Sequence, residues 1–207
     1  MDILHGLGAK FGTDKAIHTF KGVDYLDVYS GYFEPVRESV KTVFEIGVLR
    51  GASLKVWREY FPKAEIWGLD IDPEAIADYG ERIHVVQGSQ IDPLALAKIA
   101  PGCLFDVVID DGSHVVDHIL RTFELVWPRV KPDGFYVVED LQVSYWDISG
   151  EVKKWPGQHH NPPDTNYKND RAKLDRLFTT SIQSLERSDN QFRFVHFWPM
   201  QCILKRA

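Results

Sequence analysis

The sequence is poor in the features that mark secreted, membrane-bound and nucleic-acid-binding proteins. It has two cysteines among 207 residues and a formal net charge of −6. An acidic balance without a basic run argues against a nucleic-acid footprint. No apolar run approaches the roughly 20 residues of a membrane span, and residues 1–18 lack the apolar core of a signal peptide. We therefore predict a cytoplasmic protein with no membrane or nucleic-acid partner, in which Cys103 and Cys202 are buried, reduced thiols.

Repeats, low-complexity tracts and domain linkers are also missing, whereas apolar residues are plentiful. With 44% hydrophobic and 13% aromatic residues, the chain can bury a full core. We predict one domain over residues 1–207. Residues 1–40 form an N-terminal arm, loosely ordered in one interpretation, and an aromatic-rich helix over Val23–Glu38. The irregular segment 141–167 reads as a lid or substrate loop.

Short apolar, β-branched runs alternate with helical patterns along the rest of the chain. Helices are expected up to Tyr60 and over Pro93–Ile99, Val115–Val130 and Lys168–Glu186, with Pro132 and Gly134 as breakers. Strands are expected at Thr42–Gly47, Glu65–Asp70, Arg82–Gln87, Phe105–Asp110 and Gly134–Val138, followed by a hairpin of Gln191–Phe197 and Met200–Leu204. This order predicts an α/β fold: a single doubly wound, Rossmann-like domain with a seven-stranded, mostly parallel sheet and a C-terminal antiparallel hairpin.

Acidic residues follow two of the predicted strands. Asp111 and His114 come after Phe105–Asp110, and Glu139 and Asp140 come after Gly134–Val138. The carboxyl ends of parallel strands share one edge, where open α/β sheets bind ligands. Three carboxylates there repel one another unless a proton or a cation neutralises them. All-oxygen ligands suit a hard ion, so we predict Mg²⁺ held by Asp111, Glu139 and Asp140.

A metal-held hydroxyl becomes more acidic, and His114 lies close enough in sequence to Asp111 to take its proton. Imidazole titrates in the right range for a general base, so His114 is the predicted catalytic residue. For Asp110 two interpretations stay open: it caps the next helix, or it belongs to the cofactor-binding residues.

A glycine turn connects the first predicted strand to the following helix. Gly47 and Gly51 flank this turn, which lets the backbone approach a ligand and directs the helix N-terminus toward it. Asp70 ends the next strand about 20 residues further on, where a ribose-binding carboxylate is expected. The turn is not the Gly-x-Gly-x-x-Gly of dinucleotide-binding proteins.

These motifs together resemble a known superfamily. Glu45-x-Gly47-x-x-x-Gly51 is similar to the first motif of class I S-adenosylmethionine-dependent methyltransferases, and Asp70 to their ribose acid. The Asp-Gly-Ser-His of residues 111–114, with Glu139-Asp140, more narrowly resembles the Mg-dependent macrolide sugar O-methyltransferases of the mycinamicin type. Residues 10–15 also resemble an N-terminal stretch of that group.

The resemblance implies a role for each matching residue. It implies that the metal ligands are Asp111, Glu139 and Asp140, the general base is His114, and the residues near the methyl donor are Glu45, Gly47, Gly51, Asp70, Ser89 and Gln90. Enzymes of the mycinamicin type carry an additional N-terminal domain, for which we expect no counterpart in this sequence.

The resulting hypothesis is transfer of a methyl group from S-adenosylmethionine to a small-molecule hydroxyl acceptor, most readily a sugar, assisted by Mg²⁺. One alternative is a catechol-type O-methyltransferase acting on a phenolic diol. Others are an NAD-dependent oxidoreductase and a non-catalytic binding module on the same sheet. The aromatic N-terminal helix and segment 141–167 could face either the substrate or a partner subunit of a homo-oligomer.

Overall fold

The computed structural model of the chain describes residues 2–16, 24–145, 169–187 and 191–207. The seven strands are β1 (Thr42–Ile46), β2 (Glu65–Asp70), β3 (Ile83–Gln87), β4 (Phe105–Asp110), β5 (Val130–Val138), β6 (Phe192–Trp198) and β7 (Gln201–Arg206). The α-helices are α1 (Ile3–Phe11), α2 (Tyr25–Phe33), α3 (Ala52–Tyr60), α4 (Pro93–Leu96), α5 (Val116–Val126) and α6 (Arg171–Arg187). Short 3₁₀ helices cover Asp14–Ala16, Glu34–Val36, Pro73–Ala75, Trp127–Arg129 and Leu141–Tyr145.

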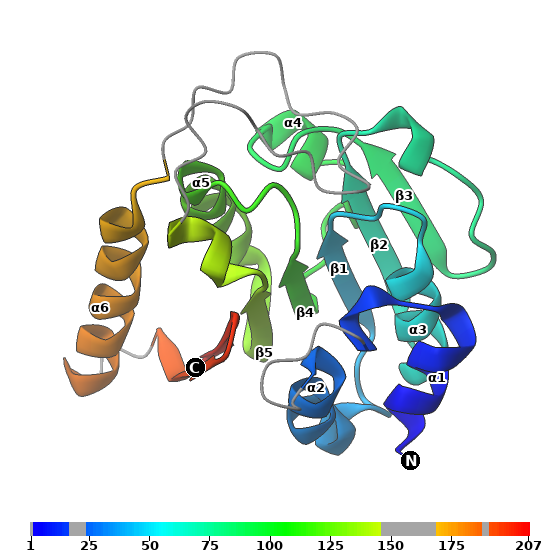
Figure 1. Cartoon of the computed structure of the whole chain (residues 1–207), viewed down its shortest axis with the longest axis horizontal. Helices are drawn as coiled ribbons and strands as arrows, with labels where there is room; N and C mark the ends of the chain where they lie inside the picture. The colour runs from blue at the N-terminus through cyan, green and yellow to red at the C-terminus, as the bar shows by residue number, and fades with distance from the viewer. Residues whose placement is uncertain (1, 17–23, 146–168, 188–190) are drawn as a thin grey trace.

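The strands form one sheet in the order β3-β2-β1-β4-β5-β7-β6. Strands β1 to β5 pair in parallel, whereas β7 pairs antiparallel with both β5 and β6. The predicted doubly wound domain with seven strands and a C-terminal antiparallel hairpin is therefore confirmed. The strand order reverses at β1 and β4, and the carboxyl ends of β1, β4 and β5 lie next to one another (Figure 1).

Two apolar layers cover the two faces of this sheet. Helices α1, α2 and α3 pack on one face, and α4, α5 and α6 pack on the other (Figure 1). Side chains alternate along each strand, so Val107 of β4 faces the first layer and Val108 the second. Within the described ranges, no helix is both long and apolar enough to cross a membrane.

The predicted helix over Val23–Glu38 is shorter in the structure. Asp24 caps α2 by accepting a 2.8 Å hydrogen bond from the backbone N–H of Asp27, whose side chain accepts in return from the N–H of Asp24. The helix ends at Phe33 and tightens into a 3₁₀ turn. Pro35 explains this end, because proline has no N–H to continue the α-helical ladder.

Three further expectations are corrected. The N-terminal arm is not loosely ordered but forms α1, whose Leu4 and Gly8 are buried. The predicted breakers Pro132 and Gly134 lie within β5, where the pairing with β4 shifts register. Cys103 is exposed because it lies in the loop before β4, whereas Cys202 is buried in β7; both are free thiols.

A histidine joins the starts of α1 and α2. His5 Nδ1 lies 2.9 Å from Asp2 Oδ1, and His5 Nε2 lies 3.2 Å from Asp24 Oδ1 and 3.4 Å from Asp27 Oδ1. Burial lowers the pKa of His5, but the three carboxylates raise it, and the result is a raised pKa.

A raised histidine pKa makes stability fall with increasing pH. Between the two pKa values, the folded protein binds more protons than the unfolded chain. The stabilisation is therefore complete below the unfolded pKa near 6.5 and is lost as pH rises through the higher folded pKa. We expect the unfolding free energy to fall by under about 1 kcal/mol across this window, since the pairs are partly exposed. His5→Gln should reduce this dependence of the unfolding free energy on pH, measured by urea unfolding at pH 6 and pH 8. An unchanged dependence would contradict the raised pKa of His5.

Candidate active site

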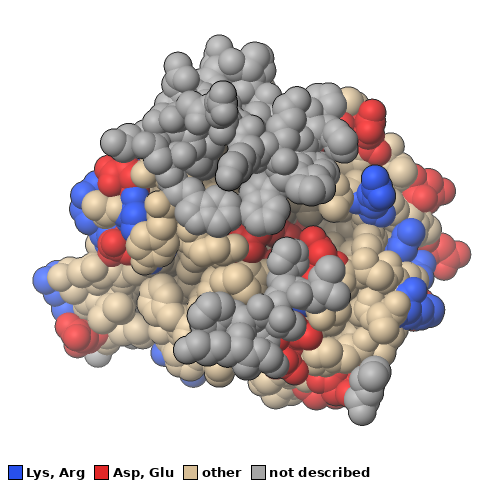
Figure 2. Space-filling view, in the orientation of Figure 1, with Lys and Arg blue, Asp and Glu red and all other residues tan. Residues whose placement is uncertain are grey.

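Three carboxylates lie on one face of the sheet at the ends of three adjacent strands. Glu45 of β1, Asp111 after β4 and Glu139 after β5 continue the side-chain alternation of their strands and face the layer of α1, α2 and α3. Glu45 and Glu139 are buried, and the side chain of Asp111 is 23% exposed. In Figure 2, acidic side chains gather near the centre of this face of the molecule.

A lysine from the N-terminal segment lies between these carboxylates. The Lys15 ammonium is 2.6 Å from Asp111 Oδ2, 2.8 Å from Glu139 Oε2 and 3.2 Å from Glu45 Oε1, and its side chain is only 2% exposed. Lys15 is not among the site residues predicted from the sequence. Its one signal was the resemblance of residues 10–15 to the macrolide group, because the cation and its partners lie far apart in the chain.

Burial controls the acid–base behaviour of this cluster. It raises the pKa of Glu45 to about 7 and holds that of Glu139 well above its usual range, although Lys15 opposes both effects. Burial alone would lower the pKa of Lys15, but Asp111, Glu139 and Glu45 together lift it well above its ordinary value. One ammonium for three carboxylates leaves a site that favours a further proton or cation.

Aromatic donors complete the hydrogen bonds of these acids. Tyr29 of α2 donates to Glu139 Oε1, and Tyr25 donates to Asp140 Oδ1 at 2.6 Å. Trp57 of α3 donates from Nε1 to Glu45 Oε2 at 2.9 Å. Both oxygens of Glu139 therefore bind protein donors, one from Lys15 and one from Tyr29.

The predicted metal ligands come together in two parts. One side-chain ligand atom each from Asp111, His114 and Asp140 lies within 4.8 Å of the others, an arrangement that can hold a metal ion. His114 Nε2 is 3.6 Å from Asp140 Oδ2, and these side chains are only partly buried. Glu139 lies deeper, against Lys15. The carboxylate oxygens of this outer group suit a hard divalent cation such as Mg²⁺.

Two residues of this outer group have left-handed backbone conformations. His114 has a φ of 56° and Asp140 a φ of 53°, values that residues with a Cβ atom rarely adopt. Such local strain persists only where the surrounding structure enforces it, and it concentrates at functional sites. His114 and Asp140 are therefore held in place at an energetic cost.

The glycine turn after β1 touches the acid cluster. Gly47 has a φ of 88°, and a Cβ atom there would lie 2.1 Å from the carbonyl oxygen of Asp111. Gly51 caps α3 with a φ of 68°, and a Cβ would meet the ring of Tyr79 at 2.3 Å. Both positions require glycine. Asp70 Oδ2 accepts hydrogen bonds from the N–H groups of Val48 and Leu49 at 2.7 and 3.0 Å, so the predicted ribose acid also shapes this turn.

Asp110 and Gln90 lie on the opposite face of the sheet from Glu45. Gln90 donates to Asp110 Oδ1 and Tyr136 donates to Asp110 Oδ2, both at 3.2 Å, and burial raises the pKa of Asp110 to about 7. Gln90 Oε1 accepts from the N–H of Ser113 at 2.8 Å, which ties the loop after β3 to the loop after β4.

Asp110 does not cap α5, whose N-cap residue, Val115, makes no side-chain cap bond. Ser89, in the same loop as Gln90, is partly exposed.

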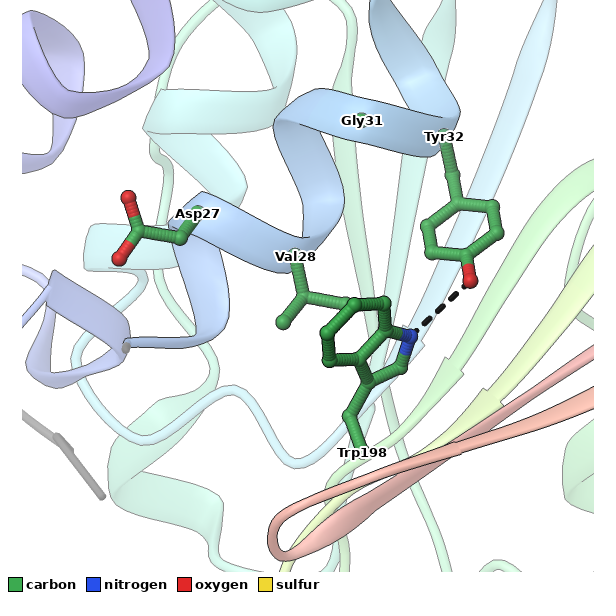
Figure 3. Close-up of a pocket in the computed structure, with 5 residues that line it drawn as sticks. All are labelled: Asp27, Val28, Gly31, Tyr32 and Trp198. Carbon is green, nitrogen blue, oxygen red and sulfur yellow. Dashed lines mark hydrogen bonds between the residues drawn. The ribbon is translucent and has the colours of Figure 1, made fainter. Parts of the chain in front are cut away.

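A separate groove of about 360 Å³ lies between α2 and the turn from β6 to β7. It is lined by Asp27, Val28, Gly31, Tyr32 and Trp198. Trp198 Nε1 donates to the Tyr32 hydroxyl at 2.9 Å, and the indole lies beside Val28 (Figure 3). None of the predicted site residues lines this groove. The predicted lid over 141–167 lies, beyond Tyr145, outside the described residues.

Comparison with known proteins decides the nature of the central domain. Residues 44–141, which include the glycine turn and the acidic residues up to Asp140, match the family model described as a methyltransferase domain. Residues 44–141 are a methyltransferase domain. The predicted superfamily is thus confirmed, and the match favours a methyltransferase over the alternative of an NAD-dependent oxidoreductase.

Curated relatives of this methyltransferase domain act on glycosylated natural products. The chain is 40% identical over 152 residues to 8-demethyl-8-alpha-L-rhamnosyl tetracenomycin-C 2'-O-methyltransferase of Streptomyces olivaceus, covering 69% of the chain and 39% of that protein. It is 40% identical over 126 residues to mycinamicin VI 2''-O-methyltransferase of Micromonospora griseorubida, covering 57% of the chain and 31% of that protein. The chain thus spans about two fifths or less of the length of these relatives.

A solved structure extends the similarity across the whole methyltransferase fold. The MycE methyltransferase of the mycinamycin biosynthetic pathway, in complex with Mg and SAH, superposes with a TM-score of 0.74 and 30% identity, covering 100% of this chain and 55% of that one. The predicted resemblance to macrolide sugar O-methyltransferases is therefore confirmed.

Backbone strain at His114 can be measured by comparing two variants that both lack the imidazole. His114→Gly should be more stable than His114→Ala by about 1 kcal/mol, because only alanine carries a Cβ that opposes the left-handed conformation. Urea unfolding of both variants measures the difference.

The same pair of substitutions at Arg121, exposed on α5, serves as the control. There alanine should be the more stable by about 1 kcal/mol, since the backbone is helical. An alanine variant at position 114 as stable as the glycine variant would show that this backbone is not strained.

Proposed function

We propose that this chain is an S-adenosylmethionine-dependent O-methyltransferase that methylates a sugar hydroxyl of a glycosylated small molecule. The acceptor binds beside Asp111, His114 and Asp140, and the methyl donor binds over the turn of Gly47 and Gly51. The proposal includes Mg²⁺ as the cation of the acidic site.

One observation carries this proposal: the glycine turn of Gly47 and Gly51 (the donor turn) is in direct contact with the carboxylate residues at the strand ends (the acid cluster). The backbone of Gly47 approaches the carbonyl oxygen of Asp111 so closely that no side chain fits between them. A donor bound along this turn therefore lies next to the carboxylates. Holding donor and acceptor at neighbouring positions of a rigid sheet converts a bimolecular reaction into an intramolecular one.

The residues present suit a divalent cation. Asp111 and Asp140 offer carboxylate oxygens on the partly exposed side of the cluster, whereas the predicted ligand Glu139 lies deeper and is bound to Lys15 and Tyr29. When bound, Mg²⁺ would acidify a hydroxyl and orient it. The structural relative MycE, which carries Mg and SAH, supports this assignment.

His114 takes the hydroxyl proton. The oxygen then forms a bond to the methyl carbon as the bond from that carbon to the sulfonium sulfur breaks, which leaves a neutral thioether. Asp140 Oδ2 lies 3.6 Å from His114 Nε2 and stabilises the imidazolium that forms.

Glu45, Gly47 and Gly51 line the methionine part of the donor. Asp70 binds its ribose, and Ser89 and Gln90 lie toward its adenine, with Asp110 supporting Gln90.

The acceptor class follows from the relatives. Their names specify methylation of rhamnosyl tetracenomycin and of mycinamicin, both glycosylated compounds.

The experiment is calorimetric titration of metal-free protein with S-adenosylmethionine and with NAD, followed by turnover assays with Mg²⁺ on rhamnosides and on catechols. Methyl transfer to rhamnosides supports the proposal. Transfer to catechols alone indicates the phenolic alternative, and donor binding without any transfer indicates a binding module.

His114→Ala should lose turnover by about 10²- to 10⁴-fold, because the general base is removed. Its affinity for S-adenosylmethionine should stay within a few-fold of the unmodified protein, since His114 is assigned to the acceptor side. Single-turnover rates and calorimetry measure the two quantities separately.

His84→Ala is the matched control, since His84 is exposed on β3, where it pairs with Glu65 at 2.7 Å and stacks on Trp67. It should keep full turnover. Retained turnover in His114→Ala would show that another group accepts the proton.

A further inference from the structure

We propose that Lys15 is a permanent part of the metal site: its ammonium stays bound to Asp111 and Glu139 when a divalent cation binds beside it, and it positions these carboxylates. This inference rests on the proposed function. In it, the acid cluster holds two cations at two depths, the lysine inside and the metal ion outside.

Lys15 belongs to the deeper part of the cluster. Its side chain is 2% exposed, and those of Glu139 and Glu45 are 1% and 0% exposed. Mg²⁺ sheds its water reluctantly and usually keeps several water ligands. A buried volume filled by an ammonium and packed carboxylates has no room for such a hydrated ion.

The outer part of the cluster has the opposite character. The side chains of Asp111, His114 and Asp140 are 23%, 14% and 21% exposed, and the carboxylates of Asp111 and Asp140 converge beside the His114 imidazole. The hydrogen bond from Lys15 ends on Asp111 Oδ2 and leaves Oδ1 for a second cation. Asp111 can therefore bridge the two, with one oxygen for each.

Displacing the lysine would leave a buried carboxylate without its cation. Glu45 Oε1 is buried, accepts no hydrogen bond of good geometry and has the Lys15 ammonium at 3.2 Å as its cation. Trp57 donates only to Oε2. Removing one partner of a buried ion pair leaves an uncompensated charge, which is strongly unfavourable. The metal ion is therefore better accommodated beside Lys15 than in its place.

Lysine labelling tests whether Lys15 stays in place. The unmodified protein is reductively methylated with formaldehyde and cyanoborohydride, with and without Mg²⁺, and modified lysines are identified by mass spectrometry. Lys15 should remain unmodified in both samples. Lys10, whose side chain is 55% exposed in the same segment, should be modified in both. Magnesium-dependent labelling of Lys15 would overturn the inference.

Thermal unfolding of Lys15→Met provides an independent test. Losing the cation should lower Tm by about 10 °C, as expected for breaking a buried ion pair in a chain of this size. Mg²⁺ should raise the Tm of the unmodified protein by at least as much as that of the variant, so that the gap persists. If Mg²⁺ restores the variant to the Tm of the unmodified protein, the ion takes the place of the lysine and the inference is wrong.

Lys10→Met is the matched control, because Lys10 pairs with Glu59 at the surface, 2.7 Å away. Its Tm should hardly change. Calorimetry with Mg²⁺ alone separates the inference from the function on which it rests. If Mg²⁺ does not bind, the metal of the proposed function fails; if it binds and Lys15 becomes reactive, only this inference fails.

Discussion

The site depends on one electrostatic requirement: carboxylates that a parallel sheet brings together need cations and hydrogen-bond donors. Because β1, β4 and β5 are adjacent and in register, Glu45, Asp111 and Glu139 emerge on the same face. Burying them without partners would cost several kcal/mol for each charge. Lys15, Tyr29 and Trp57 meet this requirement, so the packing of three N-terminal elements against the sheet is part of building the site.

The donor turn and the acid cluster are connected through hydrogen bonds and backbone contacts. Asp70 accepts from the backbone of the glycine turn, and the glycine turn contacts the backbone of Asp111. The strained conformations of His114 and Asp140 lie directly beyond this contact. A change in any of these backbone positions therefore alters both halves of the site, and the reacting groups keep a fixed relation to one another.

Most of the fold and the outline of the site could be predicted from the sequence, because both follow from local patterns. Buried strands read as apolar runs, and parallel pairing brings the residues after β4 and β5 to one edge. What remained hidden depends on contacts between distant residues. Lys15 looks like any surface lysine until residues 111 and 139 are placed beside it. The different depths of Glu139 and Asp140 follow from α2 packing, which no local pattern reveals.

The ion pair between Lys15 and Glu139 joins residues 124 positions apart, which has a consequence for biosynthesis. A ribosome delivers the lysine long before its acidic partners, and β7, which covers the open edge of β5, follows later still. Contacts of such long range form late and slowly during folding. The cation-binding cluster is therefore completed only after β5 and β7 have emerged, and a nascent chain that lacks them has no finished metal site.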